Sequence, residues 1–103
     1  MDFVWDEKKR LLNLREHGID FADCAQLFRG PVVTWPDSRF DYGEERHVAV
    51  GLIRDRVIVT AFTGFRDAIR VISMRKASKH EEASYFENLS RLEDGLEASA
   101  STA

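Results

Sequence analysis

The apolar positions along the chain are spaced first as in a short strand and then as in helices. Residues 2–5, Asp-Phe-Val-Trp, fit the pattern well enough to predict a short opening strand. Asp6 offers an N-cap for the helix that follows, and Gly18 offers its stop. A second short helix is predicted over 21–28, before the Gly-Pro pair at 30–31.

From residue 32 onward the apolar period changes to two. Four runs, 32–35, 48–52, 57–63 and 69–74, predict strands. The tight turn at Arg54-Asp55 and the short links between the last three runs favour an antiparallel meander.

The last segment returns to helical spacing. Ser78 and Glu81 match a capping box, in which a serine hydroxyl and a glutamate carboxylate reciprocally bond free backbone amides. The helix that they open carries an apolar stripe of Tyr85, Leu89, Leu92 and Leu96. The chain then ends in small, polar residues, so we expect one domain over 1–94 and a disordered tail over 95–103.

These elements predict an α+β fold. Their order is β-α-α-β-β-β-β-α, with an antiparallel sheet packed by helices in one compact domain of the 103-residue chain. The first 18 residues are dense in charge, and no apolar run reaches the roughly 18 residues of a membrane span, so we expect neither a signal peptide nor a membrane protein. The single cysteine, Cys24, fits a reducing compartment. We therefore expect a cytoplasmic protein in which this thiol is buried and unreactive.

Positive charge gathers between residues 66 and 79 of a chain whose formal net charge is −3. This basic segment holds one acid, Asp67, beside Arg66, Arg70, Arg75, Lys76 and Lys79. The commonest reason for a basic segment in an acidic chain is a partner that carries phosphate.

Metal chemistry has little support in the sequence. The histidines His17, His47 and His80 show no ligand spacing with Cys24. We therefore expect no metal site and no cofactor.

Three blocks of the sequence, in order, resemble the BrnT family, the ribonuclease half of a bacterial type II toxin–antitoxin pair. The first block contains Phe3, Trp5-Asp6, Lys9, Asn13, His17-Gly18 and Phe21; the second contains Glu45-Arg46 and Gly51; the third contains Ile69-Arg70, Arg75-Lys76-Ala77-Ser78-Lys79 and Glu81, and ends at Tyr85. Each block alone is weak, but together they cover residues 2–87 and are specific.

The resemblance implies a RelE-like fold and a toxin that cleaves RNA and inhibits translation and growth. It also implies neutralisation by a BrnA-like antitoxin with a ribbon-helix-helix domain, through which the complex binds operator DNA. In one place the chain departs from the pattern: Gly64-Phe65 follows Thr63, where many members have an acidic residue and an arginine. This departure supports an alternative function, a weakened module of the same fold that binds RNA or antitoxin without cleaving.

Cleavage of RNA without a metal uses the substrate's own 2′-hydroxyl as the nucleophile. It requires a base, positive charge near the phosphorus oxygens and a proton donor, and guanidinium groups suit the charge because they bond phosphate oxygens in pairs. The candidate catalytic residues are Arg70, Arg75, Lys76 and Tyr85, and the candidate RNA-binding residues are Lys9, Arg46, Arg66 and Lys79. An arginine cannot be the base. The candidates for the base are Lys9, His17, Glu45, Lys76, His80 and Tyr85.

Structural interpretations of the same residues stay open. Arg70 and Arg75 are five apart on one predicted strand, which nominally directs them to opposite faces of the sheet. Arg70 could pair with an acid across the sheet. Arg75 and Lys76 could be solvated charges, and Tyr85 could be a core or interface residue.

Overall fold

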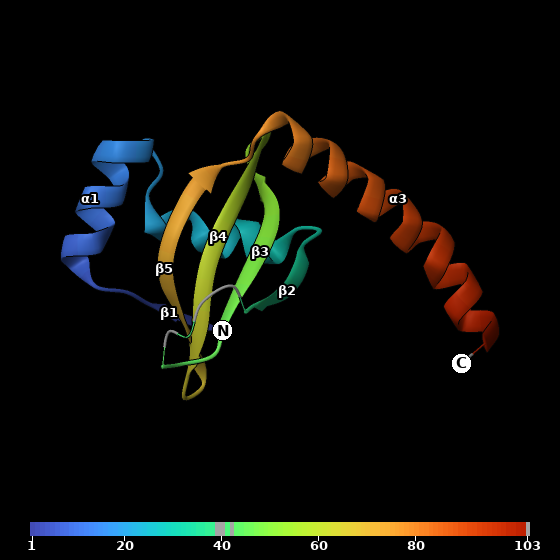
Figure 1. Ribbon diagram of the computed structural model, residues 1–103, viewed down its shortest axis with the longest axis horizontal. Coiled ribbons are helices and arrows are strands. Elements are labelled where there is room, and N and C mark those ends of the chain that lie inside the picture. Colours follow the sequence, from blue (N-terminus) through green and yellow to red (C-terminus); the bar gives the residue numbers. More distant parts are fainter. Residues whose placement is uncertain (39–40, 42, 103) are drawn as a thin grey trace.

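The molecule is built on one mixed β-sheet. The computed structural model describes residues 1–38, 41 and 43–102, with the side chains of Phe65 and of residues 92–102 outside the description. Within it the sheet has the order β1-β5-β4-β3-β2, with strands β1 (Asp2–Val4), β2 (Val33–Asp37), β3 (Arg46–Ile53), β4 (Arg56–Phe65) and β5 (Ala68–Lys76) (Figure 1).

Helices precede and follow the strands. They are α1 (Glu7–His17), the 3-10 helix η1 (Phe21–Asp23), α2 (Cys24–Arg29) and α3 (Lys79–Thr102). The α+β class is confirmed. The second predicted helix, over 21–28, begins as the 3-10 turn η1 before it continues as α2. The disordered tail predicted over 95–103 falls on residues whose side chains are outside the description, and it stays a prediction.

The prediction of a wholly antiparallel sheet is wrong at one edge. The pairs β2·β3, β3·β4 and β4·β5 are antiparallel, as the short links require. The pair β1·β5 is parallel, with Asp2 opposite Ala68. The chain reaches β5 from β1 only after crossing the rest of the domain, and the local sequence of a three-residue strand does not fix the direction of such a distant pairing.

The predicted helix caps are present. The Asp6 carboxylate accepts hydrogen bonds from the backbone N–H groups of Lys8 and Lys9, at 2.8 and 3.3 Å. Gly18 ends α1 in the left-handed conformation, with φ of 69°. Ser78 and Glu81 form the capping box reciprocally: the Ser78 N–H donates to Glu81 Oε1 at 2.9 Å, and the Glu81 N–H donates to Ser78 Oγ at 3.1 Å. The beginning of α3 is therefore fixed at the exit of β5.

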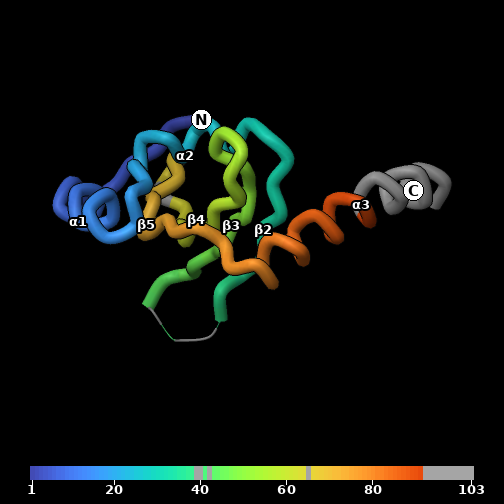
Figure 2. The backbone as a smooth tube through the Cα atoms, turned by 90° about the horizontal axis from the view of Figure 1, so that it is seen from above, coloured from blue at the N-terminus to red at the C-terminus, as the bar shows by residue number. Residues whose placement is uncertain are grey.

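The two faces of the sheet are covered differently. The helices that precede β2 pack on one face, over a core that includes Phe21, Leu27, Ile58 and Met74. The start of α3 packs on the other face, against Val50, Val57 and Val59. Figure 2 shows α2 and the start of α3 on opposite sides of the strands. We call the second side of the sheet the α3 face. Figure 1 shows α3 leading away from the sheet, and Trp35, Ser73 and Arg75 are exposed on this face.

A bulge in β5 decides which side chains lie on the α3 face. Ala61 of β4 is opposite Ser73, but the next residue, Phe62, is opposite Val71, so Ile72 is an extra residue in β5. Val59 and Thr63 share one face of β4, and their partners are Arg75 and Arg70. The bulge therefore brings Arg70 and Arg75 to the same face despite their odd spacing.

Gly51 of β3 allows α2 to approach the sheet. A Cβ atom at this position would lie 2.8 Å from Leu27 Cγ and 3.0 Å from its Cδ2. We expect Gly51→Ala to lower the free energy of unfolding by about 1–3 kcal/mol, since overpacking forces the core to shift. Urea unfolding measures the change. The matched control is Gly64→Ala in β4, where a Cβ would meet nothing within 4 Å; equal losses in the two variants would contradict this packing.

Candidate functional site: a groove on the open face of the sheet

An open groove of about 340 Å³ lies on the α3 face between β2 and β5. Its floor is formed by strand residues from the middle of the sheet: Val48, Val59, Ala61 and Ser73. Trp35 and Asp37 of β2 line one side, and Arg75 and Glu81 line the other. The groove thus combines an apolar floor with charged groups at both rims.

Arg75 is held at the rim by a bidentate ion pair. Its Nη1 and Nη2 donate to Glu81 Oε1 and Oε2 at 2.7 and 2.8 Å, with 46% of the Arg75 and 33% of the Glu81 side chain exposed. The hydrogen bond from Arg75 lowers the pKa of Glu81 to about 2, against the opposing effect of desolvation. Glu81 is therefore a carboxylate at any working pH. The two parallel hydrogen bonds to its oxygens fix the plane of the Arg75 guanidinium.

The low pKa of Glu81 predicts a dependence of stability on pH. Its folded value, about 2, lies below its ordinary value of 4.5, so the pair stabilises the fold fully above about pH 4.5 and loses this contribution as the pH falls through 2. Glu81→Gln keeps a capping side chain but removes the charge. We expect the difference in unfolding free energy between wild type and Glu81→Gln to shrink from pH 6 to about pH 2.5, measured by urea unfolding. A constant difference would contradict the charge pairing.

Arg46 and Arg70 form a second cationic group farther along the same face. Glu44 bridges them, with Arg46 Nε at 3.2 Å from Oε1 and Arg70 Nη2 at 2.6 Å from Oε2. Desolvation raises the pKa of Glu44, but the hydrogen bond from Arg46 and the charge of Arg70 outweigh it, so this pKa lies below its usual value. At roughly 3.3 Å per strand residue, Arg70 and Arg75 are about 13–16 Å apart. The structure brings them to one face but not to one point, and the pairing of Arg70 with an acid is the contact that it shows.

Tyr85 has the contacts of a packing residue. Its side chain is 2% exposed, and its hydroxyl donates to the Pro31 carbonyl oxygen at 2.6 Å. Tyr85 was a candidate proton donor or base. Burial raises the pKa of the phenol, whereas a base requires a lowered one, and the phenol's proton is already donated to Pro31. These contacts favour the core interpretation over the catalytic one, and they tie α3 to the segment that precedes β2.

The remaining predicted residues do not line the groove. Lys76 is opposite Ile58, on the face of the sheet away from Arg75. Lys79 is the exposed first residue of α3, and Arg66 lies in the turn between β4 and β5 with φ of 56°. Lys9 is exposed on α1, which lies beside β5 away from α3 (Figure 1). None of these placements tests a role in binding RNA. Of the two neighbouring cations, Arg75 lines the groove and Lys76 does not.

Trp35, Asp37 and Ser73 are groove residues that the sequence analysis did not identify. The available signal was the alternation of Val33, Trp35 and Asp37, which directs all three to one face of the edge strand. The predicted strand stopped at residue 35, yet β2 continues through Pro36, which is tolerated because β2 is an edge strand. Nothing local in the sequence indicates that this strand lies opposite the start of α3.

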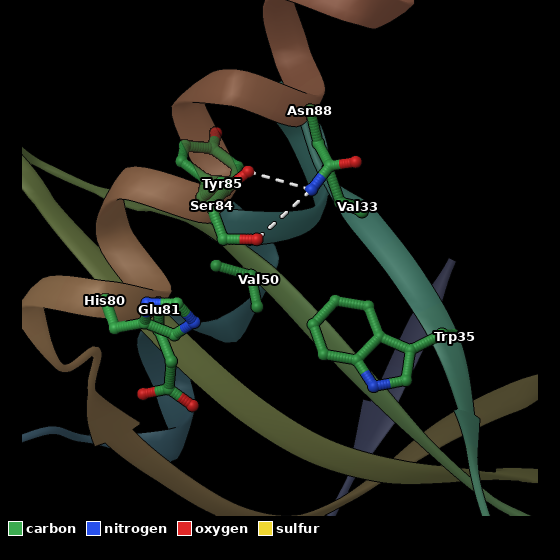
Figure 3. A pocket seen from close by; sticks show the side chains of 8 residues that line it. All are labelled: Val33, Trp35, Val50, His80, Glu81, Ser84, Tyr85 and Asn88. Atoms are coloured by element: carbon green, nitrogen blue, oxygen red, sulfur yellow. Dashed lines mark hydrogen bonds between the residues drawn. The ribbon is translucent and has the colours of Figure 1, made fainter.

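Of the six candidates for the base, His80 lies beside Arg75's groove. It lines an adjoining pocket together with Trp35 and Glu81, and these last two residues line the groove as well. Figure 3 shows His80 and Glu81 on the first turns of α3, facing Trp35 across Val50. By contrast, His17 lies at the end of α1, and Glu45 precedes β3. Tyr85 lines the same pocket, so His80 and Tyr85 are the two base candidates that lie beside the groove.

Other chemistry receives no support from the described part of the chain. Its residues contain no group of three or more His, Cys, Asp or Glu that could hold a metal ion. Cys24 is fully buried, which confirms the predicted burial of this thiol, and burial raises its pKa to about 12. No helix in the described residues is long and apolar enough to cross a membrane.

Comparison with protein families gives a match over most of the chain. Residues 5–81 match a family model described as the ribonuclease toxin, BrnT, of a type II toxin–antitoxin system. The chain belongs to the BrnT family. The resemblance found in the sequence is confirmed, and membership implies RNA as the target and an antitoxin as the partner. The BrnT match includes Trp35, Arg75 and Glu81 but ends before Tyr85. A search of curated proteins finds no match.

Proposed function

We propose that this BrnT-family chain is an endoribonuclease that cleaves single-stranded RNA in the groove of the α3 face, without a metal. The observation that supports this most strongly is the guanidinium of Arg75, fixed by Glu81 at the rim of an open groove. A planar fork of donors suits a phosphate because it bonds two oxygens at once. The RelE-like fold implied by the resemblance belongs to the same proposal.

In this mechanism the substrate's 2′-oxygen attacks the adjacent phosphorus. The bond from phosphorus to the 5′-oxygen breaks, which leaves a 2′,3′-cyclic phosphate on one fragment and a 5′-hydroxyl on the other. Arg75 stabilises the extra negative charge on the phosphorus oxygens as it develops. The 2′-hydroxyl loses a proton and the departing 5′-oxygen gains one. We assign this transfer to His80, because imidazole is the side chain type best suited to take and give protons near neutral pH.

The RNA backbone would extend from Arg75 along the groove toward Arg46 and Arg70. Phosphates at that end would compete with Glu44 for the two guanidinium groups. In this proposal Lys79, Arg66 and Lys9 add positive charge that attracts the RNA. Affinity should then fall steeply with added salt, since each neutralised phosphate releases counterions.

The partner in this proposal is a BrnA-like antitoxin with a ribbon-helix-helix domain. It would cover the groove and bind operator DNA as a complex with the toxin, in the cytoplasm. Released toxin would then inhibit translation and growth by cleaving RNA.

A second candidate function is a module that binds RNA or antitoxin without cleaving. The observation in its favour is that Glu81 already occupies two donors of Arg75, so a phosphate must share or displace this carboxylate. The Gly64-Phe65 departure from the family pattern points the same way, although the side chain of Phe65 is outside the description.

Incubation of the purified protein with single-stranded RNA in EDTA separates the two functions. The nuclease proposal predicts fragments from the wild type, and the same fragments from Arg29→Ala, which removes an exposed cation from the end of α2. Intact RNA from a folded protein that still binds it would support the binding module. Fragments that appear only after a divalent metal is added would overturn the proposed mechanism.

A further inference from the structure

A small pocket adjoins the groove between β2 and the first turns of α3. Its volume is about 120 Å³, and a water molecule takes about 30 Å³ in the liquid, so the pocket has room for a single flat ring. Val33 and Val50 give it an apolar base, and Trp35, His80, Ser84 and Asn88 surround them (Figure 3).

Trp35 is the unusual feature of this pocket. Its side chain is 45% exposed, and the indole extends from β2 toward α3 across the pocket (Figure 3). The pocket is also preformed, because the bond from the Tyr85 hydroxyl to the Pro31 carbonyl ties α3 to the β2 side. An exposed indole that lines a mainly apolar cavity offers a stacking surface for another ring.

The pocket adjoins the groove that Arg75 lines. Trp35 and Glu81 line both spaces, so the indole is the wall that they share. A ligand with a ring in the pocket and a phosphate bonded to Arg75 would occupy both neighbouring spaces. Nucleotides of single-stranded RNA have this construction, and their unpaired bases stack on aromatic side chains.

Polar groups at the α3 side of the pocket can read the edge of a base. Asn88 Nδ2 donates to the Ser84 backbone oxygen at 2.8 Å and to Ser84 Oγ at 3.4 Å. An amide and a hydroxyl held together in this way present both donors and acceptors. A base that matches them would bind better than one that does not.

We propose that this pocket binds one unpaired base of the RNA, stacked on Trp35 and selected by Ser84 and Asn88, next to the phosphate that Arg75 holds. The proposal rests on the proposed function for the identity of the ligand. It makes Trp35 and Asn88 determinants of sequence preference rather than parts of the cleavage chemistry.

Fluorescence of Trp35 tests the proposal directly. The chain has two tryptophans, so a Trp5→Phe background leaves Trp35 as the single tryptophan. Phenylalanine at position 5 keeps an aromatic ring against Phe21. Titration with single-stranded 2′-O-methyl RNA, which lacks the attacking hydroxyl, should quench this fluorescence. Inorganic polyphosphate should compete for the cations without quenching. RNA that binds without quenching, or quenching equally by polyphosphate, would overturn the proposal.

Variants give a second, independent measurement. Trp35→Leu should weaken binding of the same RNA about 5- to 150-fold, and Trp35→Phe should keep most of the affinity. Asn88→Ala should change the relative affinities for the four homopolymers and leave polyphosphate binding unchanged. Unchanged RNA affinity in Trp35→Leu, with only an antitoxin bound less tightly, would assign the pocket to protein recognition and overturn the proposal.

These outcomes are separable from failure of the proposed function. Quenching by RNA in a protein that never cleaves would keep the base pocket and reject the nuclease. Cleavage that is unchanged by Trp35→Leu would keep the nuclease and reject the base pocket.

Discussion

Arg75→Ala is expected to lower the rate of RNA cleavage by about 100- to 1,000-fold while the protein stays folded. This is the usual loss when one preorganised donor to a developing oxyanion is removed. The fold should tolerate the change because the Arg75 side chain is 46% exposed and Glu81 keeps its capping bond from the Ser78 N–H. Single-turnover cleavage, with circular dichroism as the check on folding, measures the effect. Arg75→Lys should recover part of the rate, since a point charge replaces a fork.

The neighbouring cation provides the matched control. Lys76 is as close to Arg75 as the sequence allows, but it is opposite Ile58 on the other face of the sheet. We expect Lys76→Ala to change the rate about twofold or less, as for an ordinary surface position. Equal losses in the two variants would mean that the charge of the basic segment matters and the position of Arg75 does not.

The largest effect on stability is expected at Asn13. It is a polar residue of α1 only 6% exposed; its Nδ2 donates to the Ile19 carbonyl oxygen at 3.0 Å, and its Oδ1 accepts from the Met74 N–H at 3.1 Å. Strand β1 pairs with β5 only as far as Arg70. Beyond Arg70, the Asn13 side chain accepts a hydrogen bond from the backbone at the edge of β5. Asn13→Ala should lower the free energy of unfolding by about 2–4 kcal/mol, because it leaves a buried donor and a buried acceptor unpaired.

Urea unfolding of Asn13→Ala checks this value against Asn88→Ala. Asn88 is exposed on α3, and its bonds stay within that helix, so its loss should cost at most about 0.5 kcal/mol. A small effect at Asn13 would mean that another group or water satisfies the Met74 N–H.

The parts of the fold that the sequence predicts are those set by neighbouring residues. The helix caps are formed by hydrogen bonds between residues a few positions apart, at Asp6, at Gly18 and between Ser78 and Glu81. Their sequence patterns therefore predict the caps without knowledge of the tertiary structure. Strands β3 to β5 follow from alternation and short links. The parallel pairing of β1 depends on a contact between residues 2 and 68, which no local pattern records.

The candidate site was only partly predictable for the same reason. Arg75 was found through its charge and its family motif. Its shared face with Arg70 depends on the bulge at Ile72, which the pairing with β4 creates. The catalytic interpretation of Tyr85 lost support through a bond to Pro31, 54 residues away. Trp35 was missed because no local pattern in the sequence indicates that β2 lies opposite the start of α3.

The chemistry of the cut ends tests the central claim most directly. Wild-type protein is incubated in EDTA with a defined single-stranded RNA, and with the same RNA carrying one 2′-deoxy nucleotide at the cleaved position. The account predicts fragments with 2′,3′-cyclic phosphate and 5′-hydroxyl ends from the first RNA and no cleavage at that position in the second. Fragments with 5′-phosphate ends, or cleavage at the 2′-deoxy position, would contradict it.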